Sequence, residues 1–308
     1  MKSSTSIIVF LLLIGIMASA RSEKKIVCYY GSWATYRNGN GKLLVAMGGW
    51  NEGSENYSRI MKSYSLRSTL VKSIINFIQT WGFDGFDLDW EYPSQRGGSS
   101  DDYRNYISLL KELRESSPRG FIMSAAVGAA TYLISSAYDV KNMNKYLDFI
   151  NLMTYDYHGS WDTVTGHNAP FSSLDNTVST WIRNGASPSK LVLGVPIYGR
   201  TWTLSNSNSH GVGASTSGIG KAGRYTLEKG MMTYLEICEE FHSFRDWAKY
   251  WDNREKVPYA FRGNQWLSYD NVQSVQLKAQ YVNENSLGGI MVWSIDGDDV
   301  YGMDDENK

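Results

Sequence analysis

The sequence predicts an α/β fold of the TIM (β/α)8 barrel type, built around one parallel sheet. Apolar strand-like runs alternate with segments of helical spacing along most of the 308 residues. In one of these runs the acids fall at every second position, as expected for a strand with one face inside a barrel. The balance of 42% hydrophobic and 20% charged residues is that of a globular chain.

Each expected strand is a short apolar run, and each expected helix carries apolar residues three or four positions apart. The expected strands are Ile26–Tyr30, Lys42–Gly48, Gly85–Tyr92, Phe121–Val127, Phe149–Tyr157, Lys190–Tyr198 and Gly289–Ser294. The expected helices are Leu66–Trp81, Tyr103–Glu115, Val140–Tyr146, Leu174–Asn184 and Val272–Val282. Gly82 is expected to end the first helix, because glycine favours the position just past a helix.

One long segment, 201–268, interrupts this alternation. It is rich in Gly, Ser and Tyr and contains only short strand candidates, Val257–Phe261 and Gln265–Ser268. We expect a small α+β lobe, inserted after the strand that ends at Tyr198 and before the last strand. Residues 21–308 then form a single domain, since no low-complexity linker separates a second one.

The link between the first two strands is too short for the architecture. Only eleven residues, Gly31–Gly41, separate them, and they include Asn-Gly-Asn-Gly. Parallel neighbours need a crossover of about a dozen residues or more, usually a helix. The sequence therefore predicts seven strands, a barrel that lacks one strand.

The first twenty residues have the pattern of a secretory signal peptide. Lys2 gives a basic start, Ile7–Met17 is apolar but too short for a membrane span, and Ala18–Ala20 offers small residues for cleavage. We expect a secreted chain that begins near Arg21 and has no membrane span. Secretion also makes the sequon at Asn56 a candidate for glycosylation.

Composition argues against two classes of partner. A net charge of −1 gives no basic surface for nucleic acid or an anionic membrane. The chain contains 11 Trp and 21 Tyr, whose flat rings suit either the faces of sugars or a large core.

The stretch FDGFDLDWEYP, residues 83–93, holds the candidate chemistry. Asp87, Asp89 and Glu91 lie on one face of the expected strand and would rise toward the barrel mouth. Like charges this close cannot all be ionised, so one proton is shared and one pKa rises. Glu91, nearest the mouth, is the expected proton donor, with Asp89 as its partner. An acidic surface loop or a calcium loop fits less well, because the acids alternate with bulky apolar residues.

This motif resembles the signature of family 18 glycoside hydrolases, the chitinases and chitinase-like proteins. Further stretches resemble the same family and extend the likeness over residues 26–299, with animal and insect members most similar. They are CYYGSW at 28–33, AMGGW at 46–50, MTYDYHGSW at 153–161, TGHNAPF at 165–171, GVPIYGRTW at 194–202 and GGIMVWSID at 288–296.

The resemblance implies a retaining, substrate-assisted mechanism without metal or cofactor. Glu91 would protonate the glycosidic oxygen, Asp89 would orient the substrate's acetamido group, and Asp87 would hold the shared proton. Tyr155 would bind the acetamido oxygen. The implied substrate-binding residues are Tyr29, Trp33, Trp50, Asp84, Met153, Asp156, Trp161, Tyr198, Arg200, Trp202 and Trp293. From spacing alone, Trp50 and Trp293 fit core packing equally well.

The chain departs from the family at the short 31–41 link, where members carry a helix, the second barrel strand and a further helix. Cys28 and Cys238 pair by default in an oxidising compartment. The resemblance instead implies that the disulfide partner of each of these two cysteines is missing from this chain.

Three functions stay open: a monomeric, endo-acting chitinase that cleaves chitin or chito-oligosaccharides, a chitin-binding lectin, and an inactive truncated isoform.

Overall fold

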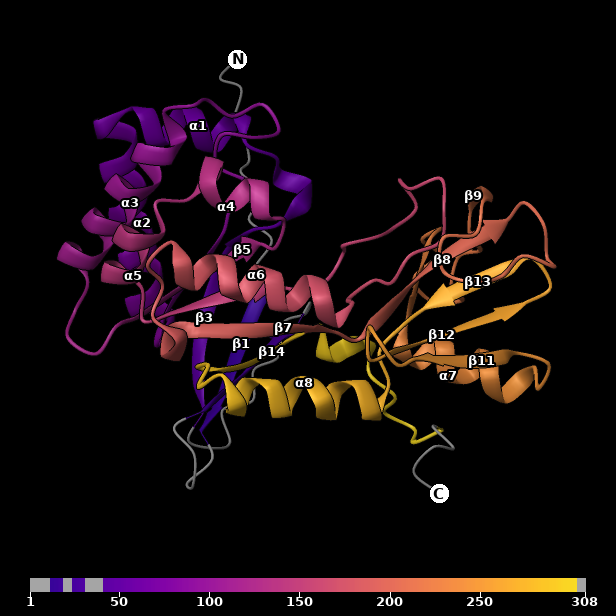
Figure 1. Ribbon diagram of the computed structural model, residues 1–308. Helices are drawn as coiled ribbons and strands as arrows, with labels where there is room; N and C mark the ends of the chain where they lie inside the picture. The colour runs from indigo at the N-terminus through magenta and orange to yellow at the C-terminus, as the bar shows by residue number, and fades with distance from the viewer. Residues whose placement is uncertain (1–11, 19–23, 31–40, 304–308) are drawn as a thin grey trace, which may run out of the picture.

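The computed structural model describes residues 12–18, 24–30 and 41–303, and its main body is a closed barrel ringed by helices (Figure 1). The strand order around the barrel is β1-β2-β14-β7-β6-β5-β4-β3. The barrel strands are β1 Leu12–Ala18, β2 Lys25–Tyr30, β3 Lys42–Gly48, β4 Gly85–Asp89, β5 Ile122–Gly128, β6 Phe149–Met153, β7 Leu191–Pro196 and β14 Gly289–Trp293. The helices around it are α1 Glu55–Lys62, α2 Tyr64–Trp81, α3 Asp102–Ser116, α4 Thr131–Ala137, α5 Val140–Tyr146, α6 Phe171–Arg183 and α8 Val272–Glu284. The predicted fold class is confirmed.

The seven strands expected from the sequence, β2 to β7 and β14, form the parallel part of the barrel. β1 is different, because it pairs antiparallel with both β2 and β3 and takes the place between them. This strand falls within the segment predicted to be a signal peptide. The barrel thus lacks one parallel strand, as expected, but the vacant place is filled and the edges of β2 and β3 are paired.

Alternation along β4 separates the core from the site. Phe86 and Leu88 point outward and pack with buried residues of the surrounding helices, including Val71 and Leu109. Since successive strand residues face opposite sides, the acids between them point into the barrel. Hydrophobic burial on the outside therefore fixes which side chains line the inside.

Helix α2 shows how local signals define an element. Ser63 caps its start by accepting a hydrogen bond from the backbone N–H of Leu66, and Gly82 ends it in the left-handed conformation with φ 67°. The helix begins two residues before the predicted Leu66. Val71, Ile74 and Ile78 form its buried face, so packing on the barrel stabilises the helix as much as its caps do.

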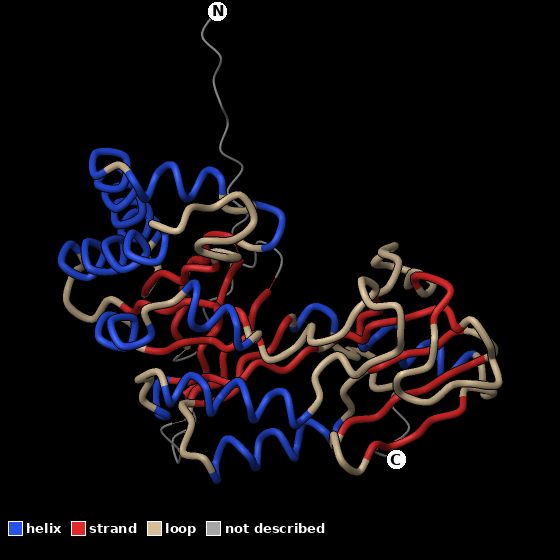
Figure 2. Tube along the Cα trace, turned by 45° about the horizontal axis from the view of Figure 1, so that its top comes forward, coloured by secondary structure: helices blue, strands red, loops and turns tan. Residues whose placement is uncertain are grey.

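The inserted lobe follows β7 directly and projects from one side of the barrel (Figures 1 and 2). Its elements are β8 Tyr198–Leu204, β9 Thr216–Ile219, β10 Met231–Thr233, α7 Tyr234–Ser243, β11 Ala248–Asp252, β12 Val257–Arg262 and β13 Gln265–Ser268. The strands form one antiparallel sheet in the order β10-β8-β13-β12-β11, with β9 against β8. The predicted α+β lobe is confirmed.

Some predicted boundaries are wrong. β4 ends at Asp89 and β6 at Met153, although strands to Tyr92 and Tyr157 were expected. At the end of β4 the backbone turns away, and the carbonyl of Asp89 accepts a hydrogen bond from the N–H of Gly49. The short helices α1, α4 and α7 were not predicted, although α5, which is equally short, was predicted as Val140–Tyr146.

The structure shows where the two cysteines and the glycosylation sequon lie. No disulfide joins Cys28, which is half-buried on β2, to Cys238 on α7, so the default pairing is not what the structure shows. Asn56 of the sequon is exposed on α1. Within the described part of the chain, no helix has the length and apolar character needed to cross a bilayer.

Candidate active site

Asp87 is the innermost acid of β4 and is fully buried. Its Oδ2 accepts a hydrogen bond from the hydroxyl of Tyr29 at 2.9 Å. Its Oδ1 accepts from the hydroxyl of Ser124 and, at 3.3 Å, from the amide of Asn151. Burial raises the pKa of Asp87 to about 6, and these three donors oppose the rise because they favour the carboxylate.

Asp89 is equally buried but is held less firmly. Among the described residues its Oδ1 has no hydrogen-bond partner. Burial, and after it the negative charges of Glu91 and Asp87, raise the pKa of Asp89 well above its usual value. Burial and the neighbouring charges therefore favour the protonated form of Asp89, and its unpaired oxygen is available to a ligand.

Glu91 lies two residues beyond the end of β4, at the barrel mouth, and is half-buried. Burial raises its pKa to about 7, and the nearby charge of Asp156 raises it further. A hydrogen bond from Tyr92 and the positive charge of Arg96 act in the opposite direction. Glu91 is therefore a carboxylic acid that still carries its proton near neutral pH, as a general acid must.

Asp156, just past the end of β6, anchors a second polar group at the mouth. Its Oδ1 accepts hydrogen bonds from the hydroxyl of Tyr198 at 2.8 Å and from Nε of Arg200 at 2.7 Å. Its backbone, at φ 58°, donates to the side chain of Asn168 at 2.9 Å. Asn168 belongs to the TGHNAPF stretch and was not assigned a role from the sequence.

Aromatic and sulfur-containing side chains form the apolar part of the site. The ring centroids of Tyr29 and Trp293 lie 5.2 Å apart, so the last strand β14 meets β2 at this point. The hydroxyl of Tyr155 contacts the sulfur of Met291 at 3.7 Å. Met153 is buried in the same cluster. Together these residues line the interior beside the acids.

Two tryptophans at the mouth are open to solvent. Trp50 and Trp161 each expose 58% of their surface. Cations lie over both rings: Arg96 is 3.5 Å from the centroid of Trp50, and Arg200 is 5.3 Å from the ring of Trp161. Exposed rings held in this way present a flat face, which suits stacking on a sugar.

The structure corrects two predicted substrate contacts. Trp202 is fully buried, donates from Nε1 to the carbonyl of Gly159 at 3.0 Å, and packs edge-on against Trp266. It offers no face to a ligand. Asp84 precedes the first residue of β4, so it lies at the opposite end of the barrel from Glu91, where it pairs with Lys42 at 3.0 Å. Trp33 lies outside the described residues.

Ser124 and Asn151 are site residues that sequence reasoning missed. Both are polar residues within otherwise apolar strands, IMSAAVG and FINLM. In the β4–β5 register Asp87 lies directly opposite Ser124, which brings the hydroxyl to the carboxylate. Ser124 and Asn151 are each a lone polar residue inside an apolar strand, and this pattern could have identified them. Buried polar groups need hydrogen-bond partners, so such a residue points to a polar group inside the barrel.

The acids do not form a metal site. No cluster of metal-ligating side chains occurs among the described residues.

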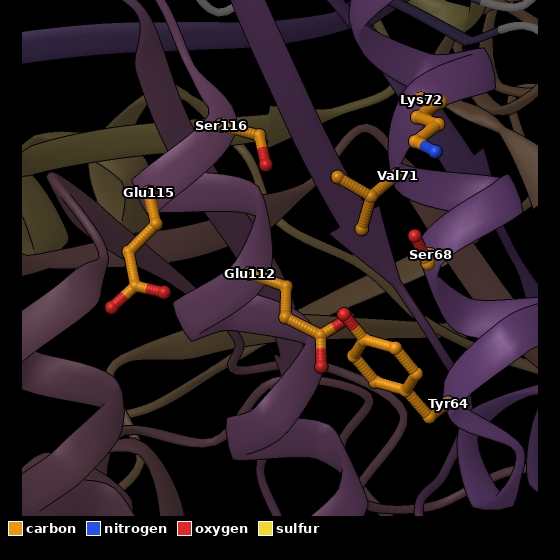
Figure 3. Close-up of a pocket in the computed structure, with 7 residues that line it drawn as sticks. All are labelled: Tyr64, Ser68, Val71, Lys72, Glu112, Glu115 and Ser116. Carbon is orange, nitrogen blue, oxygen red and sulfur yellow. The ribbon is translucent and has the colours of Figure 1, made fainter.

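A separate cavity of about 200 Å³ lies between α2 and α3 on the outer side of the barrel (Figure 3). Its lining residues are Tyr64, Ser68, Val71, Lys72, Glu112, Glu115 and Ser116. None of them belongs to the acid site.

The sequence pattern of glycosyl hydrolases family 18 matches residues 37–298. The chain belongs to this family. Chitotriosidase-1 of Mus musculus is 40% identical over 283 residues, 85% of this chain and 59% of that protein. Probable chitinase 2 of Drosophila melanogaster is 39% identical over 279 residues, 85% of this chain and 57% of that protein. The chain therefore spans less than two thirds of the length of these relatives.

Solved structures of family 18 proteins share the fold. The Group IV chitinase of Ostrinia furnacalis gives a TM-score of 0.83 at 41% identity, covering 85% of this chain and 76% of that one. Human YKL-39 is described as a pseudo-chitinase that retains chitooligosaccharide binding. Its structure gives a TM-score of 0.79 at 36% identity, covering 85% of this chain and 75% of that one. This family 18 member thus has both catalytic and purely binding relatives.

Proposed function

We propose that this chain is a chitinase, which hydrolyses β-1,4 bonds between N-acetylglucosamine units of chitin or its oligomers. The observation that carries the proposal is the row of acids along and just past β4, in which Glu91 at the mouth has a pKa of about 7 and Asp87 and Asp89 below it are buried. A protonated carboxylic acid beside an open mouth is what departure of a glycosidic oxygen requires. Turnover is then expected to fall as pH rises through about 7, where Glu91 loses its proton.

We infer a substrate-assisted, retaining mechanism. Glu91 gives its proton to the glycosidic oxygen as the bond to the anomeric carbon breaks. The acetamido carbonyl oxygen of the substrate forms a bond to that carbon, and Asp89 accepts from the acetamido N–H. Water then attacks the anomeric carbon from the face opposite the acetamido oxygen, the bond between that oxygen and the carbon breaks, and a proton of the water returns to Glu91. The unpartnered Oδ1 of Asp89 supports this role, because it has an open acceptor position.

Further residues are proposed to position the sugar. Tyr155 binds the acetamido oxygen, and Trp293 forms the apolar floor, since both border the acids. Asp156, Tyr198 and Arg200 bind the polar rim of a sugar as one hydrogen-bonded group. We propose a secreted monomer that needs no cofactor.

A chitin-binding protein without turnover is the second candidate. It is favoured by the antiparallel β1 between β2 and β3, where the other barrel strands run parallel. The intact Glu91 argues against it, because chitinase-like binding members of the family typically replace this acid. An inactive truncated isoform is the remaining alternative.

The deciding experiment measures sugar release from a soluble N-acetylglucosamine oligomer by the parent chain and by Glu91→Gln. We expect turnover by the parent and a kcat that is at least about a hundredfold lower for the variant. This loss is the typical contribution of a general acid to the rate. The variant should still bind the oligomer. Binding without turnover by both chains would favour the second candidate, and neither binding nor turnover would favour the inactive isoform.

A further inference from the structure

The loops that follow β3 and β4 are joined by hydrogen bonds at the barrel mouth. The N–H of Gly49 donates to the carbonyl of Asp89 at 2.7 Å. Ser54 donates from its N–H to the carbonyl of Arg96 at 3.2 Å and from its hydroxyl to the carbonyl of Tyr92 at 2.8 Å. These three hydrogen bonds hold the two loops together beside Glu91.

Arg96 makes the contacts that tie the exposed tryptophan to the acid. Its guanidinium lies 3.5 Å from the centroid of the Trp50 ring. Its Nη1 donates to the carbonyl of Trp50 at 2.6 Å and to the carbonyl of Glu91 at 3.0 Å. A planar guanidinium can stack and donate at once, which a lysine ammonium cannot reproduce.

This arrangement leaves one ring face of Trp50 available. Arg96 covers the other face, and Tyr92 touches the ring edge-on with 6.4 Å between centroids. The ring still exposes 58% of its surface. Without Arg96 the exposed ring would be free to rotate, and a ligand would have to immobilise it at a cost in binding free energy.

The same guanidinium brings positive charge to Glu91. The groups that face this carboxyl are Asp89 on β4, Asp156 beyond β6, and the phenols of Tyr92, Tyr138 and Tyr155. The carboxylates among them disfavour the ionised form of Glu91. Arg96 opposes them and lowers the pKa of Glu91, so it keeps that acid from holding its proton too tightly.

We propose that Arg96 is a positioning residue, whose guanidinium holds the Trp50 ring in place for a sugar and keeps a positive charge beside Glu91. The inference rests on the proposed role of Glu91 as proton donor. It assigns two measurable effects to one side chain: the stacking geometry of Trp50 sets substrate binding, and the charge sets the pH range of turnover.

Two substitutions separate these effects. Arg96→Gln keeps a donor for the carbonyls but removes the charge, so the alkaline limb of the kcat/KM profile should move up by about half a pH unit or more. Arg96→Lys keeps the charge but not the planar stack. It should leave that limb in place and raise KM about three- to tenfold. Arg104→Gln, at an exposed position on α3, is the matched control and should change neither quantity.

A direct titration keeps the test independent of turnover. Carbon NMR of the labelled Glu91 carboxyl should give a higher pKa in Arg96→Gln than in the parent, and an unchanged one in Arg104→Gln. Overlapping titration curves for Arg96→Gln and the parent would overturn the charge role, and an unchanged KM in Arg96→Lys would overturn the stacking role. If the parent releases no sugar, the proposed function fails, but the carboxyl titration still decides whether Arg96 acts on Glu91.

Discussion

Buried acids make the folded chain sensitive to pH at the level of single residues. Asp87 and Glu91 have pKa values of about 6 and about 7, both raised mainly by burial. The hydrogen bonds that Asp87 accepts from Tyr29, Ser124 and Asn151 limit the rise, whereas Asp89 has fewer donors and shifts further. Hydrogen-bond donors to Asp87, and the negative charges of Glu91 and Asp87 beside Asp89, thus distinguish two acids that burial alone would make similar.

These shifts predict how stability changes with pH. A folded-state pKa above the unfolded value means that the folded chain binds the proton more tightly. The resulting stability is complete below about pH 4 and is lost as pH rises through the folded value of Glu91, about 7. We therefore expect the urea midpoint to fall between pH 5 and pH 8 as this contribution is lost, and to fall less in Glu91→Gln. Equal declines in the two proteins would show that Glu91 does not carry the shift.

At the level of elements, the lobe sheet and the loop after β6 use tryptophan for two different purposes. On the sheet, Trp202 of β8 packs directly against Trp266 of β13 and is fully buried. In the loop after β6, Trp161 stays exposed with Arg200 over its ring. One tryptophan is therefore a core residue and the other a surface residue.

Paired substitutions test this division. Trp202→Ala should destabilise the chain by about 3–5 kcal/mol, because it leaves a cavity and an unpaired carbonyl at Gly159. Trp161→Ala should change the free energy of unfolding by less than about 0.5 kcal/mol, as is usual for surface substitutions, while raising KM for the oligomer. Urea unfolding and steady-state kinetics check both. A stable Trp202→Ala chain with raised KM would restore the stacking role predicted for Trp202.

At the level of the whole molecule, β1 closes the barrel of the uncleaved chain, whereas cleavage of the predicted signal peptide would remove this strand. Six residue pairs join it to β2 and five join it to β3. Removing the strand would leave both neighbours with unpaired backbone groups, each costing about 1–3 kcal/mol when buried. Exposed strand edges also favour association between chains.

We therefore expect a chain of residues 21–308 to unfold at lower urea than residues 1–308 and to associate more readily. Both should be produced in a host compartment without leader peptidase, and compared by urea midpoint and light scattering. Gly15→Pro in the longer chain removes one ladder N–H of β1 and should have a smaller effect of the same sign. An identical midpoint for the two lengths would mean that the barrel closes without β1.

The sequence by itself determined the features that depend on local pattern. Strand periodicity placed Asp87 and Asp89 on one face of β4, and the alternation of elements predicted seven parallel strands and an inserted lobe. Helical spacing and Gly82 defined α2 to within two residues. These signals are local, since the repeat of a strand or helix is visible within a few residues.

Only the tertiary structure decided which residues meet. Ser124 and Asn151 reach Asp87 from neighbouring strands, Arg96 joins Trp50 to Glu91 across two loops, and β1 fills the place between β2 and β3. Burial of Trp202 is likewise invisible in its local sequence. The place of Asp84 directly before the strand that begins at Gly85, in contrast, already implied the far end of the barrel. The physical reason is that contact, burial and pKa depend on groups brought together by strand register and closure, not on neighbours along the chain.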